Sequence, residues 1–88
     1  MPLTKETTVT WASRPTDPAV MQAVSQKSSE MTAEGKTDGT QATTFLDPEY
    51  VVKRPWTDQA AAQEWIAFCE QISTTYQLPI VSSTITDI

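Results

Sequence analysis

The stretch from Val51 to Trp65 reads VVKRPWTDQAAAQEW and changes character within a few residues. It begins with valines, passes through two cations and a proline, and continues through Thr57-Asp58 into alanines. β-Branched residues favour strands, and Thr or Asp directly before an apolar-periodic run is a common helix N-cap. The stretch therefore predicts a strand over Tyr50–Lys53 that Pro55 brings to an end, followed by a helix.

That helix has the clearest pattern in the chain. Its apolar residues recur at the spacing of one buried helix face; they are Ala61, Trp65, Phe68, Cys69, Ile72 and Tyr76. Leu78-Pro79 predicts the end of the helix, and the β-branched run from Ile80 to Ile88 predicts a final strand.

A similar strand-to-helix corner occurs earlier, where Val9 to Ala19 reads VTWASRPTDPA. Residues 5–12 alternate, with Val9 and Trp11 on one side, which predicts the first strand. Asp17-Pro18 predicts a helix start, and Gly35 predicts its end. The apolar stripe of this first helix contains Val20, Met21, Val24 and Met31, and Ser28 weakens it.

The middle of the chain predicts a β-hairpin. Asp38-Gly39 is a strong turn signal, residues 41–46 read as a second strand, and Asp47-Pro48-Glu49 reads as a reverse turn with proline at its second position. One long strand kinked at Pro48 is the open alternative.

The predicted order of strand, helix, strand, strand, helix, strand is the ferredoxin-like βαββαβ arrangement. We expect one α+β domain over residues 1–88, with an antiparallel sheet and two helices on one face. Trp11, Trp65 and Ile72 should share its interior. The other face, rich in Thr and Ser, should be bare.

Composition argues against several partners. Six Lys and Arg against eleven Asp and Glu give a net charge of −5, which would repel nucleic acid. The chain shows neither a signal peptide nor a run of about twenty apolar residues for a membrane span.

No pattern in the sequence indicates catalysis or a cofactor. The chain has no histidine, the commonest general base and metal ligand. Cys69 lies on an apolar helix face and reads as a core residue, and Gly35-Lys36-Thr37 reads as a turn rather than a phosphate loop. The carboxylates read as caps and surface charges. We therefore predict no catalytic, cofactor-binding or metal-binding residues.

The residues with interaction potential surround the second corner. Lys53 and Arg54 are the only adjacent basic pair, and Tyr50 and Trp56 flank them. We expect these four side chains to be exposed and to contact a partner.

Three segments resemble a group of small acidic proteins of tailed bacteriophages: TVTWASRP at 8–15, DQAAAQEWIAF at 58–68 and IVSSTITD at 80–87. The resemblance implies a ferredoxin-like domain associated with the virion or tail, located in the particle or the host cytoplasm. It implies no catalytic residues.

The leading hypothesis is therefore a non-enzymatic interaction module that docks through a sheet edge or the open face, on itself or on other virion proteins, as an oligomer or part of an assembly. One alternative is a dimeric α+β barrel enzyme of monooxygenase type that acts on a small hydrophobic molecule; another is a viral regulator that binds a host protein. A closed, partly apolar pocket with a buried polar group would favour the enzyme, whereas a filled core and an ordered edge contact would favour the interaction module.

Overall fold

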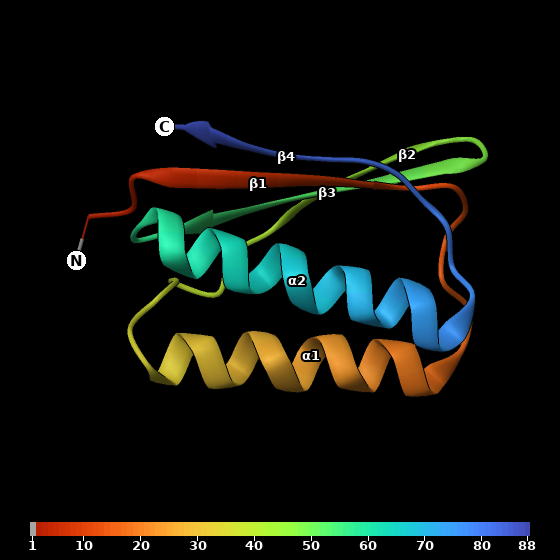
Figure 1. Ribbon diagram of the computed structural model, residues 1–88, viewed down its shortest axis with the longest axis horizontal. Helices are drawn as coiled ribbons and strands as arrows, with labels where there is room; N and C mark the ends of the chain where they lie inside the picture. The colour runs from red at the N-terminus through yellow and green to blue at the C-terminus, as the bar shows by residue number, and fades with distance from the viewer. Residues whose placement is uncertain (1) are drawn as a thin grey trace.

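A computed structural model describes residues 2–88 as four strands and two helices. Both helices lie on the same side of the sheet (Figure 1), whose antiparallel strands have the order β2-β3-β1-β4. This arrangement is the predicted ferredoxin-like sandwich. The element bounds are β1 (Lys5–Trp11), α1 (Pro18–Ala33), β2 (Ala42–Leu46), β3 (Glu49–Trp56), α2 (Gln59–Tyr76) and β4 (Ile80–Asp87).

Local signals place the helix starts where they were predicted. The Asp17 carboxylate accepts a hydrogen bond from the Ala19 amide, and Asp58 does the same for Ala61. These bonds satisfy amides that have no partner within the helix. After α1, Gly35 takes the expected left-handed conformation at φ 77°. After α2, the left-handed residue is Gln77, which no local signal predicted.

The β2–β3 segment is a hairpin, and the alternative of one kinked strand is excluded. Phe45 lies opposite Tyr50 in the antiparallel register, and Leu46 lies opposite Glu49. Asp47 and Pro48 therefore form the tip of the turn between two paired strands.

The prediction that Pro55 ends the third strand is wrong, because β3 continues to Trp56. Pro55 lies opposite Glu6 of β1, beyond the last residue of β3 that pairs with β2. Its carbonyl faces away from β1 and accepts a hydrogen bond from Thr37 Oγ1. The N–H that proline lacks would point the same way, so the β1–β3 ladder loses no hydrogen bond.

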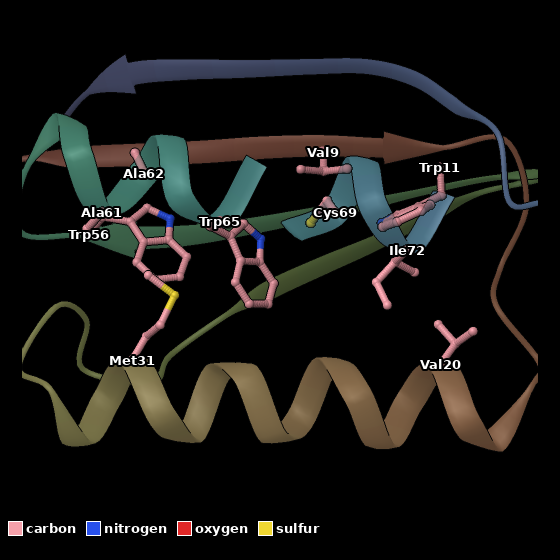
Figure 2. Packing of buried hydrophobic residues seen from close by; sticks show 10 residues of the cluster. All are labelled: Val9, Trp11, Val20, Met31, Trp56, Ala61, Ala62, Trp65, Cys69 and Ile72. Atoms are coloured by element: carbon pink, nitrogen blue, oxygen red, sulfur yellow. The ribbon is translucent and has the colours of Figure 1, made fainter. Parts of the chain in front are cut away.

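The core lies between α2 and the sheet. Trp56 and Trp65 pack with ring centroids 5.3 Å apart, and Trp11, Trp65 and Ile72 are all buried in one cluster, as predicted. Figure 2 shows this cluster below the strands. Its buried members are Val9, Trp11, Val20, Met31, Trp56, Ala61, Ala62, Trp65, Cys69 and Ile72.

Helix α1 is held to this core at its two ends. Val20 and Met31 are its only buried residues, 1% and 0% exposed, and Figure 2 shows them pointing inward from opposite ends of the helix. Between them Ala23 and Val24 are only partly buried against the core, and Ser25 and Ser28, which cannot supply apolar contacts, line the space beneath the helix. The middle of α1 therefore lies over a hollow instead of packed side chains.

The sheet face opposite the helices is bare within the described chain, as expected. The β1–β4 register pairs Thr8 with Thr84 and Thr10 with Ser82 on that face. Lys53 of β3 lies beside Thr8 on the same side. No helix in residues 2–88 is long and apolar enough to cross a membrane.

Candidate ligand-binding cavity

A cavity of about 720 Å³ lies between the middle of α1 and the sheet. Its floor is the helix-facing side of β1 and β3, and Trp65 and Cys69 of α2 form one wall. Its rim consists of exposed residues from α1 and from the segment before β2, among them Met21, Ser25 and Gly39. The volume falls in the range of about 300–1,000 Å³ that small-molecule sites occupy.

The floor has three layers, because opposite residues of paired antiparallel strands share a face. Trp11 faces Tyr50 in the first layer, and Val9 faces Val52 in the second. The third layer is polar: Arg54 lines the cavity there, and Thr7, which lies opposite Arg54 in the strand register, is buried outside the lining. The cavity therefore runs from an aromatic end, through an aliphatic middle, to a cationic end.

Arg54 is the unusual residue of this site. It is only 7% exposed, its Nη1 donates a hydrogen bond of 3.1 Å to Ser28 Oγ on α1, and its Cζ lies 4.6 Å from the ring centre of Trp65. Within the described chain no carboxylate forms an ion pair with it, and its buried Nε has no hydrogen-bond partner. Buried cations are ordinarily paired with an acid.

The charges around the cavity differ from those of the whole chain. The protein has a net charge of −5, yet within residues 2–88 the cavity lining contains no Asp or Glu and includes two arginines, Arg14 and Arg54. Burial lowers the pKa of Arg54 below its ordinary value, but an arginine keeps its charge at neutral pH. The cavity is therefore a cationic site in an acidic protein.

Cys69 adds no nucleophile to this site. Burial raises the pKa of its thiol to about 12, so the thiolate is scarce at neutral pH even with Arg54 nearby. The prediction that Cys69 is a core residue is confirmed by its 3% exposure.

The structure separates the four residues that were expected to be exposed around the second corner. Lys53 is exposed on the bare face, and Tyr50 is half-buried in the cavity wall. The expectation is wrong for Arg54 and for Trp56, which is fully buried with its Nε1 donating to Thr7 Oγ1. The reason is that β3 continues past Lys53, so that alternate residues turn inward.

Sequence reasoning missed the cavity although one signal pointed toward it. Serines interrupt the apolar stripe of α1 at Ser25 and Ser28, opposite the inward-facing Arg54. A polar break in a helix face that should cover a core indicates either poor packing or a polar site. Only the placement of Arg54 distinguishes the two.

Comparison of the chain with protein-family models, curated proteins and solved structures gives no match.

Proposed function

We propose that this protein binds a small organic anion with an apolar body in the cavity beneath α1. The observation that carries the proposal is Arg54, a buried cation that faces a roomy cavity and has no acidic partner within residues 2–88. An anionic ligand would supply the missing counter-charge. The apolar floor and Trp65 would bury the rest of the molecule.

Energetics favour a binding role for Arg54 over a purely structural one. Burial of an ion costs several kcal/mol after relaxation. The stacking on the buried Trp65 ring returns about 2 kcal/mol or more, and the hydrogen bond to Ser28 returns roughly 1.5–3 kcal/mol. A methionine would fill similar space without the cost of desolvation. An anionic ligand would add the counter-charge that neither the Trp65 ring nor the Ser28 hydroxyl group supplies.

Arg54→Met tests the proposal, with Lys53→Met as the matched control. Both variants remove one positive charge from adjacent positions of β3, but only Arg54 faces the cavity. The probes are the fluorescent anilinonaphthalene sulfonate and the uncharged phenylnaphthylamine, which has the same rings. Loss of a charged hydrogen-bond donor weakens binding about tenfold or more.

We expect the sulfonate to bind Arg54→Met at least about tenfold more weakly, and Lys53→Met with unchanged affinity. The uncharged probe should not distinguish the variants. Because removal of an unpaired buried charge should leave the melting temperature equal or higher, unfolding would not explain the loss. Equal weakening of sulfonate binding in both variants would mean that the probe responds to net charge and not to the cavity, which would contradict the proposal. Undiminished binding by Arg54→Met would refute it.

The expected role as a virion or tail module stays a prediction, as do a host-protein partner and a dimeric enzyme. The bare face is compatible with docking, but no second chain bears on it. Lys53 is the residue of the predicted interaction set that remains accessible on that face, so a docking test belongs to Lys53 and not to Arg54 or Trp56.

A further inference from the structure

We infer that the ligand of this cavity is an elongated monocarboxylate of medium chain length, bound with its carboxylate at Arg54 and its tail toward Trp11 and Tyr50. This inference rests on the proposed function and names the class of anion. It follows from the order of side chains along the cavity floor, which has a buried cation at one end only.

The floor sets the direction and the length of the ligand. From Arg54 to Val52 to Tyr50, inward-facing residues of β3 advance two positions at a time. Four residues of a strand span about 13 Å, close to the extended length of a ten-carbon acid. A compact anion such as phosphate would satisfy Arg54 and leave the apolar layers empty.

The α1 residues that line the cavity follow the same order from polar to apolar as those of the floor. Ser28 of α1 contacts Arg54, whereas Val24 and Val20, one and two helical turns earlier, line the other end of the cavity. Helix α1 and strand β3 therefore place their polar groups together and their apolar groups together. The charged head of an amphiphile would contact the polar groups, and its tail would contact the apolar ones.

The single cation limits the ligand to one buried anionic group. Within the described chain Arg54 is the buried cation of the cavity, and Arg14 lies exposed near the aromatic end. A carboxylate fits the fork of donors on a guanidinium. A second charge partway along the tail would have to lie between Val9 and Val52, where it would find no buried partner.

A chain-length series tests the inference on the intact protein. Hexanoate, octanoate, decanoate and tetradecanoate are titrated by calorimetry below their micelle concentrations, with decanol as the uncharged control. Affinity should rise about fourfold for each added methylene while the tail is being buried. It should then level off beyond decanoate, because further methylenes would lie outside the cavity. Decanol should bind more weakly than decanoate.

Val52→Trp adds a test of position, with Val51→Trp as its control. Val52 faces the cavity and Val51 faces the bare side of the sheet, so both variants insert the same ring into neighbouring sites. Val52→Trp should move the chain length at which affinity levels off from decanoate to hexanoate or octanoate, and Val51→Trp should leave that length unchanged. If Val52→Trp fails to fold, the chain-length series on the native protein still tests the inference.

The outcomes separate this inference from the proposed function. If the aromatic sulfonate depends on Arg54 but the acids show no length dependence, the anion site stands and the elongated ligand is refuted. A rise in affinity that continues unchanged to tetradecanoate would show adsorption to an open surface and would also overturn the inference. If neither the sulfonate nor the acids depend on Arg54, both proposals fail.

Discussion

The buried hydroxyl group of Thr7 makes hydrogen bonds to the Trp56 side chain and to the Arg54 backbone. It is 1% exposed, its Oγ1 accepts a hydrogen bond of 2.9 Å from Trp56 Nε1, and it donates to the Arg54 carbonyl at 3.4 Å. The indole N–H of Trp56 is buried with the rest of that side chain. A buried donor that loses its acceptor pays the full cost of its desolvation.

Thr7→Val should therefore lower the free energy of unfolding by about 1–3 kcal/mol, although the side chains have nearly the same shape. Thr8→Val is the matched control, since Thr8 faces the bare side of the sheet. We expect the free energy of unfolding of Thr8→Val to differ from that of the native protein by no more than about 0.5 kcal/mol. Urea unfolding followed by tryptophan fluorescence measures both. Equal stability of the two variants would mean that water replaces Thr7 at the indole.

Arg54 shows why sequence analysis could name a residue and misplace it. Its type and its neighbours were visible in the sequence, and the adjacent cation at Lys53 indicated an exposed strand end. In the sheet the two side chains point in opposite directions. Which of them turned inward depended on the register of β3 with β1, which pairs Arg54 with Thr7 and continues to Trp56.

At the scale of elements, α1 is the least firmly attached part of the fold. Besides its buried ends and the partly buried Ala23 and Val24, a charge cluster holds it. In this cluster Lys27 of α1 and Lys36 beyond its end both contact Glu64 of α2, each at 2.8 Å. Hydrogen bonds from Lys27 and then Lys36 hold the pKa of Glu64 below its ordinary value of 4.5. Attachment of α1 is therefore partly electrostatic.

The sign of the pH dependence follows from that lowered pKa. A carboxylate with a depressed folded-state pKa stabilises the fold above its unfolded value, and this contribution is lost as the pH falls from 4.5 through the folded value. We expect the protection factors of α1 amides, which are corrected for the intrinsic slowing of exchange at low pH, to fall over this range more than those of α2 amides.

Glu64→Gln should remove this component of the pH response and leave α1 less protected at neutral pH. The control is Glu70→Gln, because Glu70 is an exposed glutamate of the same helix and has no ion pair in residues 2–88. Native-state exchange read by mass spectrometry resolves the two helices. An α1 response that is the same in native protein and Glu64→Gln would show that other carboxylates govern its attachment.

For the whole molecule, binding and stability should be coupled. The fold is small, and a ligand that seats α1 on the sheet would bury the middle of the helix. At a free ligand concentration a hundred times Kd, ligand binding adds about 2.7 kcal/mol to the free energy of unfolding. For a domain of this size that raises Tm by roughly 10–20 °C.

Decanoate should therefore raise the Tm of the native protein by this amount and should have little effect on Arg54→Met. Calorimetry or thermal melting by circular dichroism checks the expectation. A matching rise for Arg54→Met would place the acid elsewhere on the protein, and a fall in Tm of the native protein would mark decanoate as a denaturing detergent.

What the sequence by itself determined is the order and type of the elements. Asp17 and Asp58 cap their helices, the alternation around Val9 and Trp11 places them inward, and the stripe on α2 faces the core. Each of these outcomes depends on interactions between residues near one another in the chain, so local patterns contain the information.

Only the tertiary structure decided that Pro55 could remain in a strand, that Arg54 would be buried, and that α1 would lie over a cavity. Each depends on segments distant in sequence: Thr37 against Pro55, Ser28 against Arg54, and Val20 with Met31 against the core around α2. The free energy of a buried charge depends on what surrounds it in three dimensions, and residue type and spacing leave those surroundings undetermined.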